Sequence, residues 1–183
     1  MMKKEILTPR LRLREARVED LEAMHAVLSH PLAARYWSTP PHEDIEQTRE
    51  WLTSMIEAPG RSSFDYIVEH EGRCIGKCGM YEVPVIGFIL HPDYWGRGLA
   101  AEALQAVIGR AFESLPIESI HADVDPGNVA SLSLLKKFGF RETGRAERTW
   151  FISGQWHDSI YLGLRRSDVD ESGAAPSGAT PSV

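Results

Sequence analysis

One junction constrains the fold of this chain more than any other feature: an apolar run, a glycine loop and a helix-like segment follow each other directly. They are "GFILHP" (87–92), "DYWGRG" (93–98) and "LAAEALQAVIGRAFESL" (99–115). A helix N-terminus presents unpaired amides and a partial positive charge, and small residues let an anion reach them. The junction therefore predicts either an anion site or a tight structural turn, and these residues alone leave both open.

Two familiar phosphate-binding loops are excluded here. A dinucleotide-binding loop needs the pattern G-x-G-x-x-G within a parallel strand–helix–strand unit. Here Gly96 and Gly98 supply the first two glycines, and the third is missing. A P-loop needs Gly-Lys-Ser/Thr after the loop, whereas Leu99 and Ala100 follow Gly98. Any anion bound here must be bound in another structural context.

Hydrophobic periodicity predicts the remaining elements. The order is a strand (11–16), two helices (18–30 and 42–58), three strands (63–70, 73–81 and 83–92), a helix (99–115), a strand (119–124), a helix (126–138) and a final hairpin (147–164). This predicts one mixed α+β domain over residues 1–165, with a mostly antiparallel sheet of about seven strands. Residues 166–183, rich in Ser, Gly, Ala and Pro, are expected to be a disordered tail.

Composition excludes several classes of protein. A formal net charge of −6 argues against a general nucleic-acid binder. The sequence has no apolar run long enough to span a membrane and no signal-peptide pattern, so we expect a cytoplasmic protein without a membrane partner. Cys74 and Cys78 lie about 13 Å apart if their segment is a strand, too far for a disulfide. No Cys/His pairs suggest zinc, so no metal is expected.

The junction, together with the later stretch "DPGNVASLSLLKKFGFRETG" (125–144), resembles the GNAT superfamily of acetyl-CoA-dependent N-acetyltransferases. It is most similar to the RimJ/RimL-type branch, and the likeness covers about residues 8–165. The resemblance implies a central sheet with helices on both faces, and two splayed strands that form the acetyl-CoA cleft. It also implies direct transfer of the acetyl group to an amine, without a covalent enzyme intermediate.

The resemblance also implies which residues bind acetyl-CoA. The family pattern Q/R-x-x-G-x-G/A, whose amides cradle the pyrophosphate, falls on Trp95, Gly96, Arg97, Gly98, Leu99 and Ala100, with Ala101 next. Trp95 departs from the pattern, but the grip comes from backbone amides. The preceding strand (86–90) would bind the pantetheine arm, with contacts at Ile89, Leu90 and His91, and one of its amides would polarise the thioester carbonyl.

The second motif contributes Asn128 and Ser131. Asn128 suits a helix N-cap, and in the family it would contact the pantetheine; both roles can hold. Many members place a tyrosine seven residues after this asparagine to protonate the leaving thiolate, whereas this chain has Leu135. The resemblance leaves Ser131 as a candidate acid or sulfur ligand, with a surface serine as the alternative.

The acceptor is an amine that must lose a proton. At pH 7 an α-amine is neutral at the level of roughly 10–15%, and a lysine-type amine at about 0.04%. We therefore favour a protein N-terminal α-amine over a small-molecule amine such as an antibiotic, polyamine or amino acid. Glu82 leads the candidate bases, ahead of His91 and Asp158, and each has a purely structural alternative.

Three further questions stay open. Tyr36 and Trp37 are candidates for substrate binding or for the core. A catalytically silent acyl-CoA-binding module also remains an alternative, because of Leu135. The final hairpin could pair across a dimer, so both a monomer and a homodimer are allowed.

Overall fold

The computed structural model describes residues 5–58 and 63–171, so Pro59 and Gly60, expected to close the second helix, lie outside it. The strands are β1 (Ile6–Leu7), β2 (Leu11–Arg14), β3 (Phe64–His70), β4 (Arg73–Glu82), β5 (Val85–Leu90), β6 (Ser119–Val124), β7 (Arg141–Ile152) and β8 (Gln155–Arg165). The helices are α1 (Leu21–Leu28), α2 (Pro31–Ala34), α3 (Ile45–Glu57), α4 (Leu99–Ser114), α5 (Val129–Lys137) and α6 (Arg166–Glu171). Short 3-10 turns lie at Val18–Asp20 and Pro92–Tyr94.

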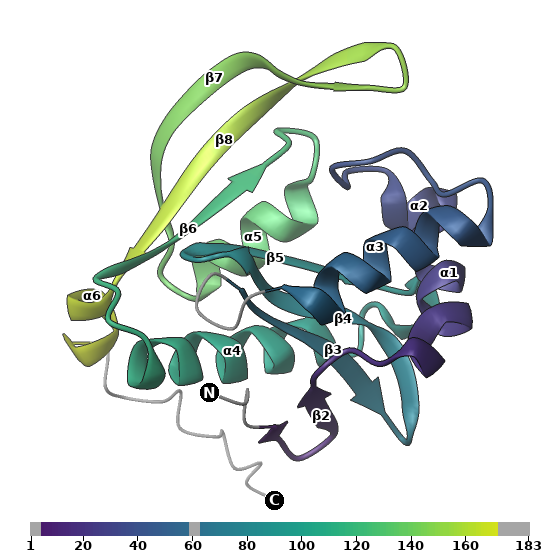
Figure 1. Cartoon of the computed structure of the whole chain (residues 1–183). Coiled ribbons are helices and arrows are strands. Elements are labelled where there is room, and N and C mark those ends of the chain that lie inside the picture. The colour runs from purple at the N-terminus through teal and green to yellow at the C-terminus, as the bar shows by residue number, and fades with distance from the viewer. Residues whose placement is uncertain (1–4, 59–62, 172–183) are drawn as a thin grey trace, which may run out of the picture.

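The strands form one mixed sheet in the order β1-β2-β3-β4-β5-β6-β8-β7. Neighbouring strands run antiparallel except β5 and β6, which are parallel. The predicted α+β class is confirmed, and β1 is the strand that the sequence did not indicate. The long β7–β8 hairpin curves away from the rest of the sheet beside β6 (Figure 1).

Helices cover both faces of the sheet. Along β3, Tyr66 and Val68 join the core beneath α4 and α5, whereas Ile67, between them, joins Met24 of α1 and Met55 of α3. This alternation is the two-residue period of a strand buried on both faces. The two helical layers therefore bury β3 and most of β4 on both faces, whereas β7 at the other edge of the sheet stays largely exposed.

Helix α4 forms where the sequence predicted it. The expected inward positions are all buried: Ala103, Leu104, Val107, Ile108 and Ala111. Gly98 precedes the helix with φ of +73°, a left-handed conformation that glycine adopts without steric cost. The junction between β5 and α4 is therefore fixed by glycine at the point where the chain turns into the helix.

Two element ends have features that the sequence pattern did not indicate. Pro31 does not only end α1; it also stands in the first turn of α2, where its missing N–H costs no hydrogen bond. The tail expected from residue 166 begins with α6, and the Arg166 guanidinium donates to the carbonyls of Phe112, Leu115 and Ile117. These bonds attach the start of α6 to the end of α4. The rest of that tail, 172–183, lies outside the described residues.

Candidate active site

The site is built where the sheet opens. The parallel strands β5 and β6 are in register only at Val85 and His121, where the His121 amide donates to the Pro84 carbonyl at 2.9 Å. Beyond this point the two strands diverge, as the splayed pair was expected to do. A cleft of about 920 Å³ lies there, lined by Gly87 and Phe88 of β5 and Asp123 of β6 among others.

Backbone direction along β5 shows which amides face this cleft. The His91 amide donates to the Ile75 carbonyl at 2.9 Å, toward β4. Because hydrogen-bonding groups alternate in direction along a strand, Ile89 also points its amide toward β4, whereas Phe88 and Leu90 point theirs toward β6. The Trp95 indole N–H donates to the Leu90 carbonyl at 2.9 Å from that same side.

This geometry distinguishes the backbone amides along β5. The His91 amide is bonded to β4, and the Ile89 amide points toward β4, so neither is directed at the cleft. Phe88, within the strand predicted to bind the pantetheine arm, has its amide and carbonyl on the cleft side, in the stretch where β6 no longer pairs with β5. Strand register set this outcome, and register cannot be read from an apolar run.

The glycine loop leaves open space beside the N-terminus of α4. Gly96 and Gly98 have φ of +69° and +73°. A methyl group added at Gly96 would meet no atom within 4 Å, and one at Gly98 only Arg10 at 3.5 Å. As N-cap, Gly98 has no side chain to bond the first amides of α4, those of Leu99, Ala100 and Ala101. A phosphate has both the space and the donors that it needs here.

Two arginines stand at this loop. Arg10 donates to the Arg97 carbonyl at 2.8 Å, and its Nε lies 2.6 Å from Glu102 of α4. The Arg97 guanidinium lies 5.6 Å from the centre of the Tyr94 ring and 3.2 Å from His70 Nε2. Arg10 is neutralised by Glu102, so Arg97 is the arginine whose positive charge adds to that of the helix terminus and favours an anionic ligand.

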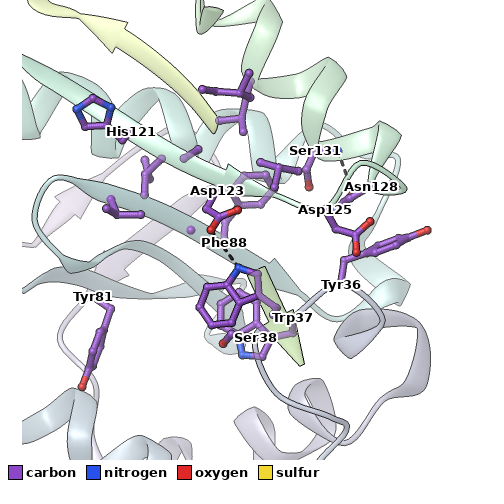
Figure 2. Close-up of a pocket in the computed structure, with 18 of the residues that line it drawn as sticks. Tyr36, Trp37, Ser38, Tyr81, Phe88, His121, Asp123, Asp125, Asn128 and Ser131 are labelled. Atoms are coloured by element: carbon purple, nitrogen blue, oxygen red, sulfur yellow. Dashed lines mark hydrogen bonds between the residues drawn. The ribbon is translucent and has the colours of Figure 1, made fainter. Parts of the chain in front are cut away.

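On the other wall, Asn128 begins α5. Its side-chain oxygen accepts from the Ser131 amide at 3.2 Å, so the N-cap interpretation is confirmed. Ser131 is half-buried and lines the cleft together with Asn128, and Leu135 is a buried lining residue. Figure 2 shows Asn128 and Ser131 at one side of the cleft, with Asp123 and Asp125 beside them. A hydrocarbon side chain therefore occupies the position where a tyrosine acid would be needed.

Tyr36 and Trp37 both line the cleft, from the segment after α2. Tyr36 is exposed, and its ring packs beside Gly127 in the loop before α5, so it is not a core residue. Trp37 is half-buried, with Lys77 5.5 Å from the centre of its ring. Lys77 Nζ is 2.7 Å from Asp65 Oδ2, and this buried ion pair underlies that wall of the cleft.

The three candidate bases differ in whether they line the cleft and in which groups they contact. Glu82 ends β4, is exposed and lines the cleft. His91 instead caps the 3-10 turn at Pro92–Tyr94, accepting from the Asp93 amide at 3.3 Å, which supports its structural interpretation. Asp158 lines the cleft, and its carboxylate accepts from the Arg148 amide at 2.9 Å.

Sequence reasoning missed the contacts between β6 and the last hairpin. The Trp150 indole N–H donates to Asp123 at 3.0 Å, and His157 Nδ1 lies 2.8 Å from Asp125 Oδ2. Both aspartates follow each other closely in "ADVDP", and "WHD" holds the histidine. The alternation of Asp123 and Asp125 on one strand face was the available signal, but their partners come from segments 27 and 32 residues away.

The cysteines do not contribute a nucleophile. Burial raises the pKa of the Cys74 thiol to about 12 and also raises that of Cys78. Both are free thiols, as expected. Within residues 5–58 and 63–171, no group of three or more His, Cys, Asp or Glu side chains is arranged to hold a metal ion. In the same part of the chain, no helix is both long and apolar enough to cross a membrane.

A divided sheet, a glycine-capped helix and a cleft open to solvent define a site for a phosphate-bearing group donor and a second substrate. A sequence profile described as "Acetyltransferase (GNAT) domain" matches residues 10–141. The chain belongs to the GNAT family of N-acetyltransferases, within its RimJ/RimL-type branch.

Relatives with known sequences and structures agree with this assignment. The uncharacterized N-acetyltransferase p20 of Bacillus licheniformis is 31% identical over 148 residues, which are 76% of this chain and 83% of that protein. Spermidine N(1)-acetyltransferase of Escherichia coli K12 is 26% identical over 158 residues, 83% and 84% of the two chains. The fold is similar to that of RimL, the ribosomal L7/L12 alpha-N-protein acetyltransferase solved with coenzyme A, with a TM-score of 0.80, 20% identity and coverage of 88% and 98%.

Proposed function

We propose that this enzyme transfers an acetyl group from acetyl-CoA to a primary amine, with a protein N-terminal α-amine as the favoured acceptor. The observation that carries the proposal is that β5 links two features: its residues Gly87 and Phe88 line the cleft, and the loop that follows it leads to the N-terminus of α4, which has no side-chain cap. Acetyl-CoA carries a pyrophosphate and a thioester at opposite ends of an extended arm, so this arrangement suits it.

In this proposal the loop residues Trp95 to Ala101 hold the pyrophosphate through backbone amides. Trp95 contributes indirectly, because its indole fixes the end of β5 through the Leu90 carbonyl. The Phe88 amide, rather than that of Ile89 or His91, polarises the thioester carbonyl. A donor in such a position is worth about 3 kcal/mol in comparable enzymes. Bound acetyl-CoA supplies the activated acyl group.

Asn128 keeps two roles in the proposal. Its carbonyl oxygen caps α5, which leaves the amide nitrogen of the same side chain to contact the pantetheine. Ser131 stands one turn along the same helix, in the cleft, and is the proposed donor to the sulfur. Glu82 is the carboxylate at the cleft mouth, and Tyr36 and Trp37 form the opposite wall against the acceptor.

An α-amine is favoured on chemical grounds, because it needs little help to lose its proton. The likeness to RimL is consistent with this choice, since that protein modifies a protein N-terminus. A small polyamine is the second candidate, favoured by the aromatic and acidic lining that Trp37, Asp123 and Glu82 contribute to one cleft. The spermidine acetyltransferase relative points in the same direction.

Thiol release from acetyl-CoA, measured with peptides carrying a free N-terminal Ser, Ala or Met and with spermidine, tests both candidates. The expected result is turnover with at least one peptide and a lower kcat/KM for spermidine. The reverse order makes a polyamine the acceptor. Tight CoA binding without turnover on any amine refutes the enzymatic proposal and favours a silent acyl-CoA-binding module. Gly98→Asp is expected to abolish CoA binding; unchanged affinity would refute the loop assignment.

A further inference from the structure

The His157–Asp125 pair has the geometry of an oriented base. Asp125 uses both carboxylate oxygens: Oδ1 accepts from the Gly127 amide at 2.7 Å, and Oδ2 lies 2.8 Å from His157 Nδ1. The carboxylate is therefore fixed by its own loop before it meets the ring. The two side chains are 29% and 19% exposed, so water reaches the pair but does not surround it.

The hydrogen bond also determines which nitrogen of the ring is available. Because a carboxylate accepts at Nδ1, the neutral ring carries its proton there, and Nε2 keeps a lone pair. His157 lines the same cleft as Phe88 and Ser131. A carboxylate behind an imidazole fixes its tautomer and stabilises the imidazolium that forms when Nε2 takes a proton.

We propose that His157, oriented by Asp125, is the general base that deprotonates the acceptor ammonium. This inference rests on the proposed acetyl transfer. The ammonium gives one proton to Nε2, directly or through one water, and His157 later releases it to solvent. The freed lone pair on nitrogen forms the C–N bond, and the C–S bond breaks with its electron pair on sulfur. The second amine proton is lost from nitrogen and ends on that sulfur.

Other charged groups share this cleft and act on the same ammonium. They come from the end of α2, from β3, β4, β6 and β8: Arg35, Asp65, Lys77, Glu82, Asp123 and Asp158. Asp65 and Lys77 neutralise each other as an ion pair. Of the remaining groups Glu82, Asp123 and Asp158 are acidic, so the cleft attracts the protonated amine, and a base is then needed to release the proton.

The pair also has a structural alternative, because it ties β8 to the end of β6. The Trp150–Asp123 hydrogen bond is a second tie of the same kind, from β7 to β6, and Trp150 is the register partner of His157. Trp150→Phe removes that tie without removing a base. It is therefore the matched control for His157→Gln.

The size of the expected effect follows from the ionisation of the amine. If His157 removes the ammonium proton, a variant without His157 can use only the acceptor molecules that are already neutral. Its kcat/KM then carries a penalty equal to the inverse of that neutral fraction. At pH 7 that penalty is about tenfold for an α-amine and about 10³-fold for an alkylamine. It decreases as the pH approaches the pKa of the amine, because the amine then deprotonates by itself.

The experiment measures kcat/KM between pH 6.5 and 9.5 with the best peptide acceptor and with spermidine. The variants are His157→Gln, Asp125→Asn, Glu82→Gln and Trp150→Phe, and CoA affinity is titrated for each. For His157→Gln we expect unchanged CoA affinity. At pH 7 its kcat/KM should decrease about tenfold with the peptide and about 10²- to 10³-fold with spermidine, and both decreases should become smaller as the pH rises.

Asp125→Asn is expected to show a smaller decrease in kcat/KM with the same pH trend. Trp150→Phe is expected to show a decrease in kcat/KM that is equal at every pH.

Four results would overturn the inference. A loss in His157→Gln that is constant with pH, like that of Trp150→Phe, makes the pair a structural tie. A pH-dependent loss in Glu82→Gln but not in His157→Gln makes Glu82 the base. Absence of thiol release by the unchanged enzyme refutes the proposed function itself and this inference with it, whereas turnover with an unaltered His157→Gln profile refutes only the inference.

Discussion

Replacing Gly98 by alanine tests two separate demands on this residue: a left-handed backbone conformation and open space for the proposed pyrophosphate. The first demand is conformational. Gly98 has φ of +73°, a left-handed conformation that costs an alanine about 1–2 kcal/mol. No neighbour adds to this cost in the free protein, because the added methyl would meet nothing nearer than Arg10 at 3.5 Å. The free energy of unfolding should therefore decrease by about 1–2 kcal/mol.

The second demand appears only with the cofactor. The methyl would project into the space that the proposed pyrophosphate needs, displacing it from the amides of the first turn of α4. Losing one hydrogen bond to a charged group costs about 1.5–3 kcal/mol, which is about a 10- to 150-fold increase in Kd. The dissociation constant of CoA, measured by titration calorimetry at a temperature where the variant is folded, should increase by at least about tenfold.

Gly109→Ala is the matched control. Gly109 lies within the same helix, is exposed, and has no atom within 4 Å of the position of an added methyl. This change should stabilise the protein by about 1 kcal/mol, because alanine favours the helix interior, and should leave CoA affinity unchanged. A Gly98→Ala protein that is folded and binds CoA within about twofold of the original would refute the assignment of this loop to the pyrophosphate.

Two further predictions concern the supports of the site. Lys77→Met should lower the free energy of unfolding by about 3–5 kcal/mol in urea denaturation, because Asp65 stays buried without its ammonium partner, and the double variant Lys77→Met with Asp65→Leu should recover most of it. Partial burial raises the pKa of Glu102, but hydrogen bonds from Thr8 and Arg10 outweigh it and leave that pKa lowered. A carboxylate with a lowered folded-state pKa stabilises the protein above the unfolded pKa of about 4.3, and this stabilisation is lost as the pH falls through the folded-state pKa, so Glu102→Gln should cost about 1–3 kcal/mol at pH 7 and progressively less as the pH falls below about 4.3.

Short-range sequence patterns predicted the structural features that depend only on residues close together in the chain. The inward face of α4 followed from a 3.6-residue period, and the turn at Ser153–Gly154 from its residue types. The pattern is wrong where tertiary packing decides: the 3.6-residue period of residues 45–56 predicts that Ile56 is buried, yet it is 41% exposed near the end of α3. The first element, β1, has two residues, too few for any periodicity to show.

The site was predictable to the extent that it lies in one stretch of chain. Residues 95–101 are consecutive, so a motif places them together. We propose the amide of Phe88 for the thioester rather than that of Ile89 or His91, because the direction of each amide depends on the register of β5 against β4, which a uniformly apolar run does not specify. The His157–Asp125 pair depends on the register of β8 against β6 and on a turn at Asp125, so it needs two strands and a loop to be placed correctly.

The two walls of the cleft make different demands on the sequence. In the proposed function, the wall that binds acetyl-CoA uses backbone groups of β5 and the start of α4, which many side chains satisfy provided that glycines keep the loop open. The opposite wall is lined by side chains from the segment after α2, from β6 and the loop after it, and from the β7–β8 hairpin. Trp150 and His157 tie this hairpin to Asp123 of β6 and to Asp125 just after it. We therefore expect substitutions in the hairpin to change the preference for the acceptor without changing CoA affinity.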